Sequence, residues 1–351
     1  MQTAASQRAR RRRVAALLSP GLGWITVAYV VPSVLVFIYS FLTPKLGGGV
    51  IWEFSTETWQ EIVARGRRSE AGWGTVGAAA LRGMLAAAAA GAAGAAIARY
   101  LGRGGARGVL RAAGAVGALV GLHHLAIAYN NYSAVFARSV VWSLWATLIC
   151  AALALPLAVF ISSRRSPLAR NALLVAVMIP FWTSMLVRTY AIRFILANTG
   201  PLNSIIEGLG FDRIAFLNTR FSVMLGLVYT ALPFMILPLY AAVERSDGVQ
   251  LEAARDLGAR PPQVFLEVFV PLIRPGLIVG SVMVFVISVS QFLVPALLGG
   301  GKTNMIATLL GLQFGTAFNW PLGAAIATLF SLITLLSLYA LIGRKDEVEL
   351  L

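Results

Sequence analysis

Residues 272–298 read LIRPGLIVGSVMVFVISVSQFLVPALL, a run of 27 residues in which Arg274 is the one charged side chain. A helix needs about 20 consecutive apolar residues to cross the hydrocarbon core of a bilayer. The apolar residues are continuous, whereas a strand of a membrane barrel would alternate apolar with polar positions. The stretch therefore predicts a transmembrane helix.

Five further stretches have the same character. Together, the predicted spans are 18–42, 138–162, 172–196, 222–243, 272–298 and 320–343. Hydrophobic residues make up 58% of the 351-residue chain and charged residues only 12%, against about 25% charged in soluble domains. Lipid must therefore cover most of the surface, and the sequence predicts an all-α polytopic membrane protein with no separate soluble domain.

The basic residues indicate how the chain is oriented. The net charge is +15, and most Lys and Arg lie in short loops beside apolar runs, where cytoplasmic loops are enriched in them. Arg164 and Arg165 follow the second span, the segment 244–274 follows the fourth, and Lys345 follows the last. This pattern favours an inner-membrane, multi-pass protein with both termini in the cytoplasm, and it argues against nucleic-acid binding.

The organisation along the chain follows from these spans. The first apolar run is too long for a cleaved signal peptide, so it is expected to remain as a span. The predicted divisions are a basic cytoplasmic tail at 1–17, a transmembrane domain at 18–343 and a cytoplasmic tail at 344–351.

An Ala/Gly-rich insert at 64–130 interrupts the domain after the first span. Its apolar runs 83–98 and 112–129 are joined by a basic link. They predict two additional transmembrane helices; the alternative is a pair of interfacial or loosely packed helices. His123 and His124 close the second run without a nearby carboxylate or cysteine, which favours an interfacial polar pair over a metal site. The single cysteine, Cys150, excludes an internal disulfide.

The segment 244–271 contains Glu252-Ala-Ala-Arg-Asp-Leu-Gly258-Ala-Arg-Pro-Pro262. It predicts two short helices separated by a turn. Ser246 or Asp247 is suited to cap the first helix, Gly258 to end it in the left-handed conformation, and Pro261 or Pro262 to stand in the first turn of the second. Such a pair, held between two spans, is suited to dock in a groove on a partner; the alternative is a loop lying along the membrane surface.

This segment resembles the EAA loop of the permeases of binding-protein-dependent ABC importers. The resemblance implies the type I permease fold, with six core transmembrane helices, and a loop that contacts a separate cytoplasmic ATPase. The residues expected to couple to the ATPase are Glu252, Ala253, Ala254, Asp256, Gly258 and Phe265.

Other segments are similar to the spermidine/putrescine branch of that family. They are Pro180-Phe-Trp-Thr-Ser184, Val187-Arg-Thr-Tyr190, Pro295-Ala-Leu-Leu-Gly-Gly300 and Asn319-Trp-Pro-Leu-Gly323. The resemblance implies transport of a small polar solute such as a polyamine. Gln291 stands before Phe292 where related permeases often carry Asp or Glu, which leaves another organic amine, an opine-like compound or an anion open as the solute.

Polar and aromatic residues inside the spans are candidates to line the translocation path. They are Trp182, Thr183, Arg188, Tyr190, Tyr229 and Gln291. The alternative for each is helix packing or anchoring at the interface. A charge within a span is costly unless it reaches water, so Arg188 is expected near the outer end of its span.

Neither catalysis nor ATP binding is expected in this chain. Gly299-Gly-Gly-Lys302-Thr303 looks like part of a phosphate loop, but the first glycine of that motif would stand at position 296, which is alanine. We expect no cofactor or metal in this chain, with ATP and Mg in the partner.

The resemblance also implies the partners. They are a cytoplasmic ATPase dimer, a second homologous permease, a periplasmic or lipid-anchored solute-binding protein, the small-molecule substrate and membrane lipid. The alternative function is an ion-coupled secondary transporter acting as a single chain. The lack of carboxylates inside the spans weakens it, because proton-coupled transporters usually use them.

Overall fold

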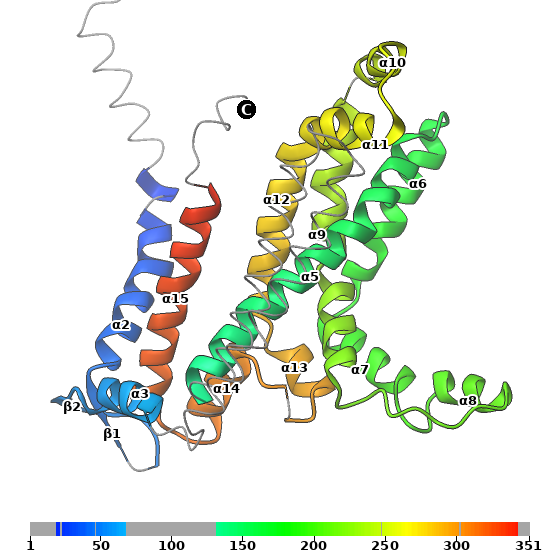
Figure 1. The fold of residues 1–351 in the computed structure, drawn as a ribbon. Helices are drawn as coiled ribbons and strands as arrows, with labels where there is room; N and C mark the ends of the chain where they lie inside the picture. The colour runs from blue at the N-terminus through cyan, green and yellow to red at the C-terminus, as the bar shows by residue number, and fades with distance from the viewer. Residues whose placement is uncertain are drawn as a thin grey trace, which may run out of the picture. The chain divides into compact units, whose positions relative to one another are not determined.

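The structure is a computed structural model that describes residues 19–67 and 131–342, apart from residues 22, 46, 247 and 302. The chain divides into two compact units, Met1–Val63 with Leu312–Ile333 and Ala64–Gly311 with Thr334–Leu351. Both units are mainly helical (Figure 1). The predicted tails at 1–17 and 344–351, and the two helices predicted in the insert, lie outside the described residues.

The first unit begins with the apolar helix Ser19–Tyr39, which comprises a π-helical turn, η1 (Thr26–Val30), and α2 (Val31–Tyr39). A two-stranded antiparallel hairpin follows, β1 (Leu42–Pro44) with β2 (Val50–Phe54), and then α3 (Glu57–Arg67). The helix ends at Tyr39 rather than at the predicted residue 42. At this end, the Ser40 hydroxyl donates a hydrogen bond to the Phe37 carbonyl at 2.6 Å, which satisfies one of the last carbonyls of the helix.

The core of the second unit consists of three helices that pack against one another, α5 (Asn131–Ser162), α9 (Arg220–Arg245) and α12 (Val270–Val289). On α5, a stripe of small side chains at four-residue spacing is fully buried: Ala146, Cys150, Ala154 and Ala158. Small residues allow membrane helices to approach closely, which increases dispersion contacts between them. This stripe explains how α5 packs tightly without large side chains.

Glycines bring α12 close to α9. A Cβ added at Gly276 would lie 2.5 Å from the Pro238 carbonyl oxygen, and one added at Gly280 would lie 2.7 Å from Met235 Sδ. Both distances are shorter than real Cβ contacts. At Gly276 the contact is with the backbone of α9, so a side chain there would require the helices to move, whereas at Gly280 it is with the end of the flexible Met235 side chain. The absence of a side chain at these glycines therefore allows α12 to lie close to α9.

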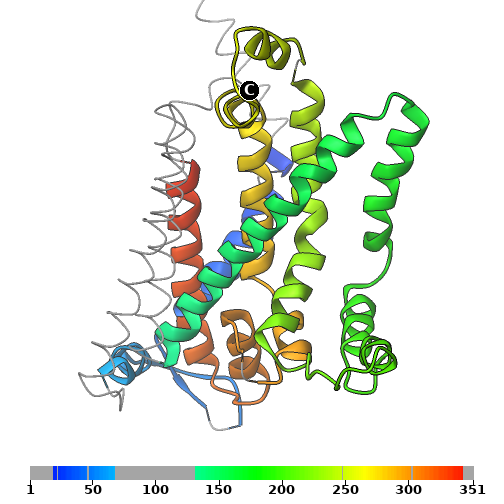
Figure 2. The same ribbon diagram turned by 45° about the vertical axis from the view of Figure 1, so that its right-hand side comes forward.

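The remaining elements of the second unit surround this core. They are α6 (Pro167–Met178), η2 (Ile179–Trp182), α7 (Met185–Ile195), α8 (Pro201–Gly208), α10 (Gly248–Asp256), α11 (Pro261–Gln263), η3 (Val264–Phe269), α13 (Leu293–Leu298) and the start of α14 (Ile306–Gly315). Figure 1 and Figure 2 both show α10 and the α5–α6 turn at one end of this unit and α7, α8 and α13 at the other. The basic turn and the EAA-like segment thus share an end.

Within the described residues, four helices are long and apolar enough to cross a membrane: Ser19–Tyr39, Val135–Ser162, Arg220–Arg245 and Pro261–Val289. The bent pair Pro167–Trp182 and Met185–Ile195 adds a fifth if it is one span. A further apolar helix, α15 (Trp320–Ile342), has 23 residues, or about 35 Å of helix. Each of the six predicted spans therefore corresponds to apolar helix.

Two of those spans are not the single straight helices that were predicted. The span predicted at 172–196 bends by 92°, because Pro180 lies in a 3₁₀ turn and Thr183 and Ser184 adopt extended backbone conformations. The span predicted at 272–298 ends at Val289, and the helix resumes as α13 after a non-helical stretch at 290–292. Hydropathy averaged over a span does not reveal such breaks, because the few polar residues within them, such as Thr183, Ser184 and Gln291, are flanked by long apolar runs.

Candidate functional site

The helix α10 ends in the turn that its sequence predicts. Gly258 has a φ of +83°, its N–H donates to the Arg255 carbonyl at 2.9 Å, and the Ala259 N–H donates to the Ala254 carbonyl at 3.1 Å. These two bonds, with a left-handed glycine, form a Schellman motif that satisfies the last carbonyls of a helix. The prediction that Gly258 ends this helix is confirmed.

The second helix of the segment begins at Pro261, as predicted. The Gln263 side chain accepts a hydrogen bond from the Arg260 N–H at 2.9 Å, which satisfies one donor at the helix start. The helix then continues through the π-helical turn η3 into α12, so that Pro261–Val289 is one helix of 29 residues. Pro271 and Pro275 lie inside this continuous helix.

The capping prediction for α10 is only partly tested. Ser246 ends α9 instead: its hydroxyl donates to the Val243 carbonyl at 2.7 Å. Asp247, the other predicted cap, lies outside the described residues.

Two stripes of α10 are exposed in this chain. Val249, Ala253 and Leu257 are spaced four residues apart and form an apolar stripe; Val249 is 65% exposed and Leu257 is 89% exposed. Glu252 and Asp256, also four apart, form an acidic stripe beside it. Because α10 packs on η3 through its other side, these stripes are available to a partner.

The predicted coupling residues thus fall largely on the accessible surface. Glu252, Ala253, Asp256, Gly258 and Phe265 are exposed, and Ala254 is half-buried. The prediction did not include Val249 or the exposure of Leu257. Their four-residue spacing with Ala253 could have identified them.

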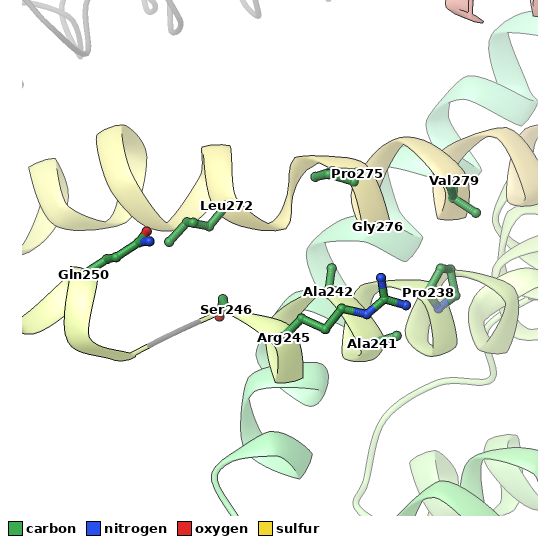
Figure 3. A pocket seen from close by; sticks show the side chains of 10 residues that line it. All are labelled: Pro238, Ala241, Ala242, Arg245, Ser246, Gln250, Leu272, Pro275, Gly276 and Val279. Carbon is green, nitrogen blue, oxygen red and sulfur yellow. The ribbon is translucent and has the colours of Figure 1, made fainter. Parts of the chain in front are cut away.

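A groove separates α10 from the core helices. It has a volume of about 380 Å³ and is lined by α9, α10 and the first half of α12. Figure 3 shows Arg245 and Ala242 of α9 facing Pro275 and Gly276 of α12, with Gln250 of α10 at one end.

An ion pair joins α6 to α9 at the same end of the unit. Arg170 Nη1 lies 2.8 Å from Glu244 Oε1, and both side chains are about one-third exposed or more. At that exposure, solvent screens the interaction, so the pair positions α6 rather than contributing much stability.

The bend in one span lies beside the break in another. Gln291, in the non-helical stretch after α12, is 8% exposed, and its Nε2 lies 3.9 Å from Sδ of Met185, the first residue of α7. Residues in sequence segments 106 positions apart are therefore in contact where both helices are interrupted. In membrane transporters, such interruptions occur where the backbone lines a cavity or is buried in protein.

Two buried polar atoms without a hydrogen-bond partner lie on the helices α12 and α7 that meet at this contact. Among the described residues, Ser288 Oγ and Arg188 Nε are buried and make no hydrogen bond. Ser288 lies near the end of α12, three residues before Gln291, and Arg188 lies one turn after Met185 on α7. The Arg188 guanidinium lies 5.4 Å from the centre of the Phe181 ring, a cation–π distance.

The other predicted path residues do not gather at this contact. Trp182 and Thr183 lie at the bend, and both are exposed in this chain. Tyr190 on α7 and Tyr229 on α9 are about half exposed. The structure therefore places Gln291 against Met185, the first residue of the helix that carries Arg188, while the two tyrosines project from α7 and α9. Met185 and Ser288 were not predicted; Ser288 could have been found from its three-residue spacing to Gln291.

Known proteins resemble the chain over most of the described second unit. The sequence model of the family "Binding-protein-dependent transport system inner membrane component" matches residues 152–345, more than half of the chain. The Haemophilus influenzae spermidine/putrescine transport system permease protein PotB is 39% identical over 239 residues, which cover 64% of this chain and 83% of that protein. The Escherichia coli protein of the same name is 36% identical over 226 residues, covering 62% and 82%.

A comparison with solved structures matched a bacterial alginate ABC transporter in complex with an alginate pentasaccharide-bound periplasmic protein. The match has a TM-score of 0.49 and 18% identity, and it covers 60% of this chain and 77% of the other.

The matched residues begin in α5 and include the bent span, the α10 segment and the continuous helix that follows it. The chain therefore belongs to the family of binding-protein-dependent transport system inner membrane components, has the type I permease fold, and is the transmembrane permease subunit of an importer of this kind.

Proposed function

We propose that the exposed stripes of α10 dock on a separate cytoplasmic ATPase, which supplies the energy for import. The observation that supports this most strongly is that α10 is followed, after one glycine turn, by a helix that runs without interruption into the membrane span. A force applied to α10 would therefore reach α12 directly. The apolar stripe provides buried contact area, and Glu252 and Asp256 complement basic side chains on the partner.

The groove beneath α10 supports a rocking movement. ATP-dependent closure of an ATPase dimer would shift α10 toward α9, and the tight contact at Gly276 would transmit the movement to the core helices. Each ligand then favours one of two states through its different contacts with them. ATP and Mg belong to the ATPase in this scheme, and this chain carries neither cofactor nor catalytic residues.

The end that carries α10 is the cytoplasmic end in this proposal. Arg164 and Arg165 lie in the α5–α6 turn at that same end, which agrees with the enrichment of basic residues in cytoplasmic loops. The same orientation places both termini in the cytoplasm. A periplasmic or lipid-anchored binding protein would then deliver the solute at the end formed by α7, α8 and α13, and a second homologous permease would complete the path.

A polyamine such as spermidine or putrescine is the solute that the relatives favour, since both are named as spermidine/putrescine permeases. Several of this chain's candidate path residues suit a flexible cation. Trp182, Tyr190 and Tyr229 offer aromatic faces for cation–π contacts, and the Gln291 carbonyl can accept hydrogen bonds from ammonium groups. Arg188 is held against Phe181, which places its charge on an aromatic ring.

Copurification tests the importer assignment. The tagged chain is isolated from its native membrane in a mild detergent, in wild-type form and as the double variant Glu252→Ala, Gly258→Val. We expect the wild type to bring an ATPase and a second permease, and the double variant to keep the permease and lose the ATPase. A wild-type chain isolated alone would contradict the proposal and favour ion-driven transport by one chain.

Uptake into proteoliposomes that contain the whole complex tests the solute separately. Radiolabelled spermidine is supplied with the binding protein and with ATP enclosed on the ATPase side. ATP-dependent accumulation supports the polyamine. ATP hydrolysis stimulated by the binding protein without spermidine uptake would contradict the solute and leave the importer assignment intact.

A further inference from the structure

The β1–β2 hairpin is joined to the first span without a flexible linker. After Tyr39, the Ser40 N–H donates to the Phe37 carbonyl and the Phe41 N–H to the Ile38 carbonyl, at 3.2 and 3.0 Å. On the other side of the hairpin, the Ser55 N–H donates to the Phe41 carbonyl at 2.7 Å. Both ends of the hairpin are therefore fastened to the end of the helix.

Aromatic rings hold the hairpin against that helix end. The Trp52 and Tyr39 rings are 6.1 Å apart and nearly perpendicular, and the Phe54 and Phe41 rings are stacked at 5.7 Å. Phe41 also stacks on Trp59 of α3, at 5.6 Å. Trp52 and Phe54 are two residues apart in β2, where the pairing with β1 is irregular.

Trp52 and Phe54 form an unusually apolar exposed surface. Trp52 is 71% exposed and Phe54 is 77% exposed, although each ring already contacts an aromatic neighbour. Glu53, between them, is charged and is also exposed. The two aromatic rings of the hairpin are therefore largely uncovered in the described residues of this unit.

The depth of the hairpin follows from the length of the first span. Ser19–Tyr39 contains 21 residues, about 31 Å of helix, which matches a hydrocarbon core of about 30 Å. Each headgroup layer adds only about 5–8 Å. Because the Trp52 ring touches Tyr39, the last residue of the helix, it must lie near the boundary between hydrocarbon and headgroups.

A second helix end lies beside the same hairpin. The position of a Cβ at Gly48, in the β1–β2 loop, is 3.1 Å from the Phe318 ring, and α15 begins two residues later at Trp320. Trp and Tyr are enriched where membrane helices cross the interface, because their rings are apolar and their N–H or O–H groups need polar neighbours. Tyr39, Trp52 and Trp320 fit that distribution.

We infer that the hairpin lies in the phospholipid interface at the C-terminal end of the first span, with Trp52 and Phe54 facing the lipid. This surface anchors the span at a fixed depth in the bilayer. A soluble partner could reach the two rings only by entering the headgroup layer. The inference rests on the membrane location of the chain and not on the solute or the ATPase.

Depth measurements with spin labels test this inference. The full chain with Cys150→Ala receives one cysteine at a time, by Trp52→Cys, Phe54→Cys or Glu53→Cys, and is labelled in nanodiscs of phosphatidylethanolamine and phosphatidylglycerol. Oxygen concentrates in the hydrocarbon, whereas a water-soluble nickel chelate does not enter it. We expect the ratio of oxygen to nickel accessibility to be several-fold higher at 52 and 54 than at the control position 53.

Two results would overturn the inference. Nickel accessibility as high at 52 and 54 as at 53 would place the two rings in water, and low accessibility to both reagents would show that protein covers them. Since replacing Trp52 could itself move the hairpin, the native ring is tested as well. The emission of wild type minus that of Trp52→Phe gives the fluorescence of Trp52 itself. Brominated lipids should quench this fluorescence, and a lack of quenching would contradict contact between the ring and lipid.

Discussion

Gln291 Nε2 lies 3.9 Å from Met185 Sδ, so the non-helical stretch that ends α12 is in contact with the first residue of α7. The two residues join the bend of one span to the break of another. Ser288 Oγ, three residues before Gln291, is buried without a hydrogen-bond partner among the described residues. Leaving a polar group buried and unpaired costs free energy, and in the proposed function such groups would be free to bind the solute.

Gln291→Leu should weaken solute transport with little effect on assembly. Losing one hydrogen bond to the solute corresponds to about 1 kcal/mol, or roughly a five-fold rise in the solute concentration for half-maximal uptake. The measurement is uptake by the reconstituted complex. Ser290→Ala is the matched control, because the Ser290 hydroxyl donates to the Val286 carbonyl of the preceding helix. Equal effects of the two substitutions on uptake would show that Gln291 does not line the path.

Leu257→Ser should weaken the association with the ATPase. Burying this exposed side chain in an interface is worth roughly 1–2 kcal/mol, so the Kd should rise about 5- to 30-fold. Titration of the purified permease complex with the ATPase measures it. Leu209→Ser changes an equally apolar exposed residue, 69% exposed, that follows α8 at the opposite end of the unit, and it should leave the Kd unchanged.

The turn at Gly258 should depend on backbone conformation and not on space. A Cβ there would meet nothing within 4 Å, but φ is +83°. A β-branched residue in the left-handed region costs roughly 1–2 kcal/mol, whereas Asn is tolerated there. Gly258→Val should therefore reduce ATPase-dependent transport clearly more than Gly258→Asn; similar losses would indicate that a partner contacts the glycine itself.

Gly276→Ala should destabilise the second unit. The added methyl group would lie 2.5 Å from both Ala242 Cβ and the Pro238 carbonyl oxygen. Relieving such an overlap costs about 2 kcal/mol of stability. Thermal unfolding in detergent should show a lower midpoint. Gly208→Ala, at a helical position with nothing within 4 Å, should not lower it, and a stable Gly276→Ala variant would mean that α9 and α12 can separate freely.

The Arg170–Glu244 ion pair should contribute little stability. Its exposure and solvent screening limit the coupling free energy to roughly 0.2–1 kcal/mol. A double-mutant cycle with Arg170→Gln and Glu244→Gln, measured at low and high salt, gives this value. The coupling free energy should decrease as salt is added. A coupling of several kcal/mol that does not change with salt concentration would show that the pair is shielded from water in the membrane.

Local segments of the sequence were sufficient to predict several features of this protein. Runs of apolar residues predict the spans, and the Schellman turn at Gly258 follows from one glycine and the helix formers before it. The beginning of the second helix at Pro261 follows equally from local backbone chemistry. These features depend on residues within a few positions of one another, which is why sequence patterns reveal them.

The sequence by itself therefore determined that the chain is a helical membrane protein with an EAA-like helical pair between two spans. Only the tertiary structure decided that the span at 172–196 bends, that α12 ends at Val289, and that these two interruptions meet at Gln291 and Met185. The same holds for the face of α10 that stays exposed and for the close approach of Gly276 to Pro238. The physical reason is that such contacts arise from packing between distant segments, whose partners no local pattern of hydropathy specifies.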